Sequence, residues 1–89
     1  MDPYKALANA IVEKAVLDYK EAVLYQLEYP ESKSAVAYVK SQERFFRSDW
    51  FRMLTTLDGE YLIRKTKQIA EEEYNAYQLE LSGQAESDD

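Results

Sequence analysis

The chain has 89 residues, enough for one small domain, and it contains neither cysteine nor histidine. Disulfide bonds, Cys/His zinc sites, thiol catalysis and histidine acid–base chemistry are therefore excluded together. The formal net charge is −6, no apolar run approaches the roughly 20 residues of a membrane span, and the N-terminus lacks a signal-peptide pattern, so we expect a soluble, cytoplasmic protein without a membrane partner.

A first long helix is predicted to begin at Asp2 and Pro3, because an acidic cap followed by proline is typical of a helix start. Leu17 and Leu24 fall outside its main apolar face. They mark either the edge of a tertiary contact or a second contact surface for a partner or a symmetry mate. The main face recurs at three- and four-residue spacing and comprises Tyr4, Leu7, Ala8, Ile11, Val12, Ala15, Tyr19, Ala22, Val23, Tyr25 and Tyr29.

A second helix follows Pro30, which ends the first because the residue before a proline is disfavoured in the helical conformation. Ser32 or Ser34 is the expected cap, and the helix should run to about Arg47. The connection is short, so the first two helices are predicted to form an antiparallel hairpin. The expected inward residues are Ala35, Tyr38, Val39, Gln42, Phe45 and Phe46.

A short third helix is predicted from Asp49 to about Thr55, with Ser48 as its cap. Asp49 would lie in the first turn, where a carboxylate is favoured by the helix dipole. We expect Trp50, Met53 and Leu54 to point one way and Phe51 partly another.

The fourth helix should begin after Asp58, with Gly59 allowing a tight entry, and stop at Ser82 and Gly83. Its apolar residues have a 3-4-4-3-4 spacing. The prediction is an all-α domain over residues 1–82, a helical hairpin plus a short third helix and a long fourth helix in a small bundle, with a disordered acidic tail at 83–89. The apolar stripe of the fourth helix comprises Ile63, Thr66, Ala70, Tyr74, Tyr77 and Leu81, and Leu62, Ile69 and Ala76 broaden it.

Charge is divided unevenly along the chain. Residues 44–67 carry six basic residues against three acidic ones, whereas residues 68–89 carry seven acidic residues and no basic one. A sustained positive surface is what nonspecific nucleic-acid binding needs, so a nucleic-acid partner is disfavoured. A local anion site in the middle segment is compatible with this distribution.

The basic middle segment has two interpretations. Arg47, Arg52 and Arg64, with Trp50 and Tyr61 as stacking walls, would hold an anionic small molecule such as a nucleotide signal near the helix starts. Alternatively, the three arginines pair internally with Asp49, Asp58 and Glu60 and fix the corner of the fold. The internal pairing is the favoured interpretation.

Eight tyrosines are many for so small a core, because each buried hydroxyl needs a hydrogen-bond partner. Several should therefore lie at the rim or at an interface, where tyrosine is enriched. We accordingly expect a homo-oligomer. The predicted interface residues are Leu17, Leu24, Tyr25, Tyr29, Tyr74 and Tyr77.

No enzyme motif is present, neither a phosphate-binding loop nor a nucleophile elbow nor a metalloprotease helix, so no catalytic residue is predicted. The densest acidic run, Glu71 to Glu73, does not predict a metal site, because consecutive helical residues diverge by about 100°. No cofactor is expected.

Two segments, Glu43-Arg44-Phe45-Phe46-Arg47-Ser48-Asp49-Trp50-Phe51 and Leu57-Asp58-Gly59-Glu60-Tyr61-Leu62-Ile63, give the chain a resemblance to a known group. It resembles small uncharacterised helical proteins encoded by phages and prophages of Gram-positive bacteria. The similarity covers about residues 10–67. It implies a non-enzymatic accessory protein that acts in the bacterial cytoplasm by binding a host or phage protein, such as a host defence or regulatory component, and it brings no active site.

Overall fold

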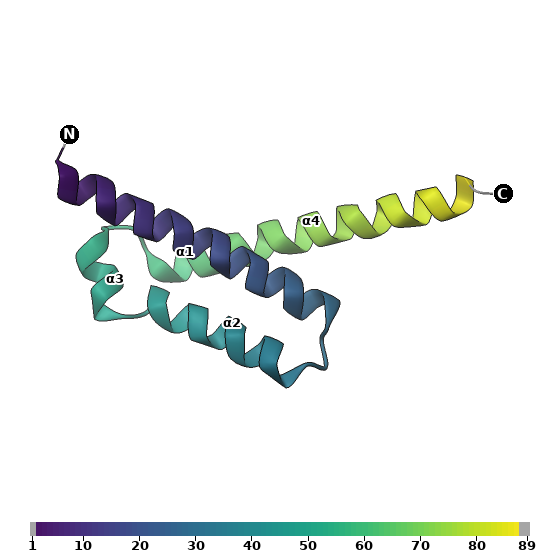
Figure 1. The fold of residues 1–89 in the computed structure, drawn as a ribbon, viewed down its shortest axis with the longest axis horizontal. Helices are drawn as coiled ribbons and strands as arrows, with labels where there is room; N and C mark the ends of the chain where they lie inside the picture. The colour runs from purple at the N-terminus through teal and green to yellow at the C-terminus, as the bar shows by residue number, and fades with distance from the viewer. Residues whose placement is uncertain (1, 88–89) are drawn as a thin grey trace.

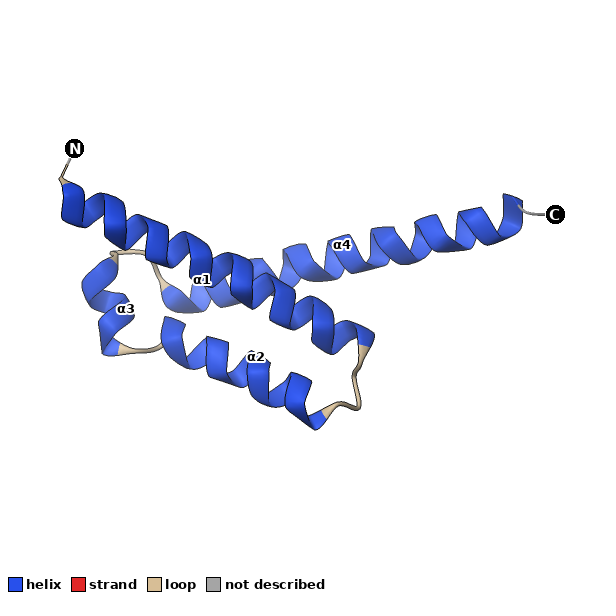
Figure 2. Cartoon of the chain, in the orientation of Figure 1, coloured by secondary structure: helices blue, strands red, loops and turns tan. Residues whose placement is uncertain are grey.

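The structure is a computed structural model that describes residues 2–87, with side chains through Gly83. Within this range the chain forms four helices joined by short loops and contains no strand (Figure 2). The predicted all-α fold, with a hairpin, a short third helix and a long fourth helix in a small bundle, is confirmed. The helices are α1 (Pro3–Glu28), α2 (Lys33–Phe46), α3 (Asp49–Leu54) and α4 (Gly59–Ser87).

Each helix begins at a predicted cap, where a side-chain oxygen accepts a hydrogen bond from a backbone N–H two or three residues further on. Between the two candidates for α2, Ser32 is the cap. The four acceptors belong to Asp2, Ser32, Ser48 and Asp58, and their oxygens lie 3.0, 3.2, 3.1 and 3.0 Å from the amide nitrogens.

The end of α4 differs from the prediction. The helix continues through Ser82 and Gly83 to Ser87. Glycine ends a helix when it adopts a left-handed conformation, and no glycine of the described chain has a positive φ. The predicted stop at Gly83 is therefore wrong, whereas residues 88 and 89 of the predicted tail lie outside the described residues.

The bundle is organised around α1, which contacts all three other helices. It forms the predicted hairpin with α2, and α4 crosses it before projecting beyond it toward the C-terminus (Figure 1). The radius of gyration is 16.3 Å, compared with about 12 Å for a compact domain of this length. The C-terminal end of α4 therefore extends beyond the bundle.

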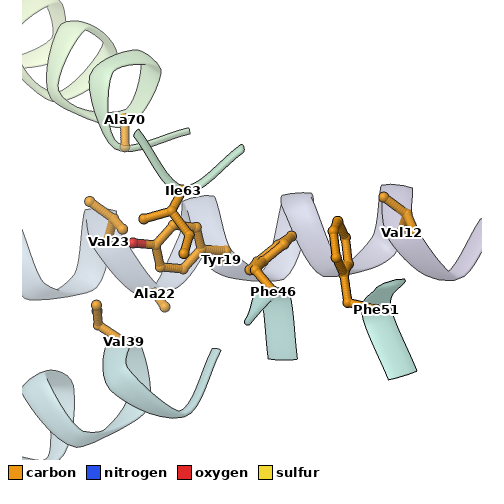
Figure 3. Packing of buried hydrophobic residues seen from close by; sticks show 9 residues of the cluster. All are labelled: Val12, Tyr19, Ala22, Val23, Val39, Phe46, Phe51, Ile63 and Ala70. Atoms are coloured by element: carbon orange, nitrogen blue, oxygen red, sulfur yellow. The ribbon is translucent and has the colours of Figure 1, made fainter. Parts of the chain in front are cut away.

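The core lies where α1 meets the other helices, and Figure 3 shows side chains from all of them directed toward α1. Tyr19 and Phe51 are the largest side chains that are fully buried. Buried apolar area of this kind is the main stabilising contribution in a domain of this size. The cluster consists of Val12, Tyr19, Ala22, Val23, Val39, Phe46, Phe51, Ile63 and Ala70.

Five residues of the predicted apolar faces of α1 and α2 are exposed instead: Tyr4, Leu7, Tyr25, Tyr29 and Tyr38. Tyr4 and Leu7 lie near the N-terminus of α1, and the helix beside this part of α1 is the short α3 (Figure 1). Tyr38 lies on a flank of α2 that no neighbouring helix covers fully. The apolar pattern of both helices is thus broader than the surface that neighbouring helices cover.

The prediction places Phe51 on a different side of the short helix α3 from Trp50 and Met53, and the structure turns the Phe51 side toward the core. Phe51 is 1% exposed, whereas Trp50 is 58% and Met53 84% exposed. The ring of Phe51 packs at 5.7 Å from Phe45 and 5.6 Å from Phe46. A helix of six residues is too short for its apolar spacing to define an inward face, so the aromatic end of α2 sets the orientation.

Candidate functional site

Two of the three arginines in the basic segment are paired internally. The Arg47 Nε lies 2.5 Å from Glu60 Oε1, and Arg52 Nη1 lies 2.5 Å from Asp49 Oδ1. Among the described side chains, Arg64 has no ion-pair partner within 4.0 Å. The interpretation that the arginines pair internally is therefore confirmed for Arg47 and Arg52. It is not confirmed for Arg64 among the described side chains.

The anion-binding residues are not gathered in one groove. A groove of about 200 Å³ at this corner has Arg47 and Arg52 in its lining, together with the carboxylates of Asp58 and Glu60. Its lining does not include Arg64, Trp50 or Tyr61. In this groove the two carboxylates neutralise the two guanidinium groups. At the starts of α3 and α4, the capping side chains of Ser48 and Asp58 already accept hydrogen bonds from backbone N–H groups that could otherwise bind an anion. The groove therefore does not favour anion binding.

Glu43 forms a polar network that the sequence did not predict. The buried Tyr19 hydroxyl donates to Glu43 Oε2 at 2.5 Å, and Lys67 Nζ lies 3.2 Å from the same oxygen. Arg47 Nη1 lies 3.5 Å from Glu43 Oε1. The carboxylate therefore ties α1, α2 and α4 together. The signal in the sequence is that Glu43 lies four residues after the buried Val39, and residues with this spacing share one side of a helix.

The network shifts the pKa values of its members. Burial raises the pKa of the Tyr19 phenol, and its hydrogen bond to the Glu43 carboxylate raises it further. Burial also raises the pKa of Glu43, but the hydrogen bonds from Tyr19 and Lys67 and the nearby cations outweigh it, so this pKa lies below its ordinary value. Glu43 is consequently ionised in the folded protein at neutral pH.

Glu43→Gln should destabilise the protein at pH 7 by about 1–2 kcal/mol, because charge-assisted hydrogen bonds to Tyr19 and Lys67 are weakened. A folded-state pKa below the unfolded one stabilises the fold above the unfolded pKa, and this contribution is lost as the pH falls through the folded pKa. The difference between the variant and the wild type should therefore shrink below about pH 4.3.

Urea denaturation followed by circular dichroism between pH 3 and pH 8 measures this difference. Glu21→Gln is the matched control, since it removes the same charge at an exposed position of α1. A Glu43→Gln variant with the same pH dependence as Glu21→Gln would contradict the role assigned to the network.

The predicted interface residues fall into three places. Leu24, Tyr74 and Tyr77 share a groove of about 320 Å³ between the end of α1 and α4. Tyr25 and Tyr29 pack against each other at the end of α1, with their rings tilted by 50° and the ring centroids 4.9 Å apart. Leu17 lies in a separate groove.

The groove that contains Leu17, here called the seam groove, lies between α1 and the start of α4. It measures about 380 Å³ and is lined by five apolar side chains and one acidic one. Leu17 is 58% and Leu57 56% exposed, so two leucines border it at the surface. Leu57 was missed from the sequence, because it lies in the loop before α4. The lining residues are Val12, Glu13, Val16, Leu17, Leu57 and Leu62.

Comparison with protein-family models, curated proteins and solved structures finds no match for the chain. Within residues 2–87, none of the four helices combines the length and the apolar character needed to cross a bilayer. The described part of the chain also places no three acidic side chains around a point where they would hold a metal ion.

Proposed function

We propose that the protein is a non-enzymatic accessory protein of a phage or prophage that works by binding another protein through the seam groove. The observation that carries this proposal is the exposure of Leu17 and Leu57 beside an apolar depression. Burying one such leucine in a complex contributes about 1.5–3 kcal/mol. Concave apolar surfaces of this kind accept side chains that anchor a partner.

The chemistry of the seam groove favours an amphipathic helix as its ligand. The groove runs between two helices, and a third helix can place apolar residues into it at three- and four-residue spacing. Glu13 supplies the one charge in the lining. A basic residue beside the apolar anchors of the partner would therefore complement it.

The resemblance to phage-encoded proteins supports a partner in the bacterial cytoplasm, either a host or a phage protein. A host defence or regulatory component is one such target. The anionic small-molecule alternative has no supporting geometry, because its residues are divided between a charge-balanced groove and separate surfaces.

Leu17→Glu should abolish capture of the partner, because it introduces a second carboxylate at the groove. The measurement is affinity capture by the tagged wild type and variants from a lysate of a phage-infected Gram-positive host, quantified by mass spectrometry. Leu79→Glu is the matched control, since Leu79 is 74% exposed on α4 and does not line the groove. Equal retention of every captured protein by both variants would contradict the proposal.

A further inference from the structure

The projecting part of α4 has an apolar stripe that nothing in residues 2–83 covers fully. Tyr77 is 54% and Leu81 42% exposed, and Tyr74 is half-buried. With Ala70 they have a 4-3-4 spacing, so they continue the side of α4 that is buried in the bundle at Ile63. We name Tyr74, Tyr77 and Leu81 the overhang stripe.

The flanks of the overhang stripe are acidic. At 100° per residue, Glu71 and Glu80 project on opposite sides of it. Residues 68–89 contain no basic residue. The ligand that fits this helix is therefore a surface with positive charge and accessible apolar groups.

The outer side of α2 is such a surface. Lys33, Lys40 and Arg44 are exposed and have no ion-pair partner among the described side chains. Together with the exposed Ala37 they have the 4-3-4 spacing of one helical stripe. The only acidic residue of α2 is Glu43, whose side chain is 12% exposed and turned into the network described above.

We propose that the overhang stripe binds the outer face of α2 in a second copy of this chain. Tyrosine rings pack on the aliphatic stems and cationic groups of lysine and arginine. The small side chain of Ala37 allows the two helices to approach closely. The acidic flanks of the overhang stripe, which include Glu71 and Glu80, then meet the positive stripe of the second copy. Neither these two glutamates nor the basic residues of that stripe are ion-paired among the described side chains.

Length and charge favour this contact over pairing between two overhangs. α2 has 14 residues and segment 74–87 has the same number, so each spans about 21 Å. Two overhangs side by side would instead bring together two segments that carry only negative charge. Each copy has one overhang and one α2, so the contact can be made twice in a dimer. It lies outside the seam groove and does not depend on the proposed function.

Charge reversal tests the proposed contact. The variant Lys40→Glu/Arg44→Glu and the variant Glu71→Lys/Glu80→Lys should each be monomeric in sedimentation velocity at 100 μM, where the wild type is associated. An equimolar mixture should associate again, because each altered surface then meets its complement. In 1 M salt the wild-type dissociation constant should rise at least about tenfold.

Every other outcome overturns the proposal. A monomeric wild type would show that the surface binds a different protein or nothing. An α2 variant that associates like the wild type would indicate contact between two overhangs. Circular dichroism establishes that the variants are folded. If a charge-reversal variant unfolds, a second pair of variants tests the same contact. Tyr77→Glu should prevent association, whereas Leu79→Glu should not, because Leu79 lies on the opposite side of α4 from the overhang stripe.

Discussion

Phe51→Ala is expected to lower the free energy of unfolding by about 3–5 kcal/mol, the range for removing a buried aromatic ring. Phe51 is 1% exposed and packs edge-on against Phe45 and close to Phe46. It also lies 3.4 Å from where a Cβ at Gly59 would be, so it holds α3 against the start of α4. A domain of this size has a total stability of about 5–10 kcal/mol, so the variant should be at the limit of folding at 37 °C.

Trp50→Ala is the matched control, and it should cost only about 1 kcal/mol. Trp50 is 58% exposed, and its only ring contact among the described residues is with Phe45, at 5.9 Å. Urea denaturation should be followed by circular dichroism, because the control removes the single tryptophan. If Trp50→Ala were as destabilising as Phe51→Ala, α3 would have the opposite orientation from the one observed.

The helix boundaries could be predicted from the sequence because they depend on local chemistry. Asp2, Ser48 and Asp58 each accept a hydrogen bond from an amide two or three residues away, so a few neighbouring residues contain the information. Gly83 is the exception, because the helix continues past it. A glycine ends a helix only when it adopts a left-handed conformation, which the residue type permits but does not require.

The orientation of each helix depends on contacts that are distant in the sequence. Tyr38 fits the apolar pattern of α2 but is exposed, whereas Glu43 is charged and faces inward. Glu43 lies there because Tyr19, 24 residues earlier, and Lys67, 24 residues later, supply hydrogen bonds that compensate for its desolvation. The residue pattern of α2 gives no information about these partners, so the inward position of Glu43 could not be predicted from it alone.

The candidate site could be predicted only in part for the same reason. The possible pairing of Arg47 and Arg52 with nearby acidic residues followed from their closeness in the chain. The sequence also drew attention to Leu17, because it interrupts the pattern of α1. Leu57 had no such signal, since an isolated leucine in a loop has no periodicity, and it reaches the seam groove only through the path of the chain between α3 and α4.

Gly59→Ala should destabilise the protein by about 2–3 kcal/mol, although alanine favours helices more than glycine does. A Cβ at this position would overlap the carbonyl oxygen of Phe46 and lie 3.0 Å from its carbonyl carbon. Both atoms belong to the backbone at the end of α2, so no side-chain rotation relieves the overlap. The start of α4 must therefore move away from α2, which strains the contacts of Phe51 as well.

Gly83→Ala provides the matched comparison, because a Cβ there would meet no atom within 4 Å. This variant should be unchanged or more stable by up to about 1 kcal/mol, the ordinary gain from replacing a helical glycine by alanine. Thermal and urea unfolding of the two variants separate steric contact from helix propensity, since the substitution is the same. Destabilisation at Gly59 with none at Gly83 would establish that α4 enters the bundle against the backbone of Phe46, whereas equal stability would show that the two helices are further apart there.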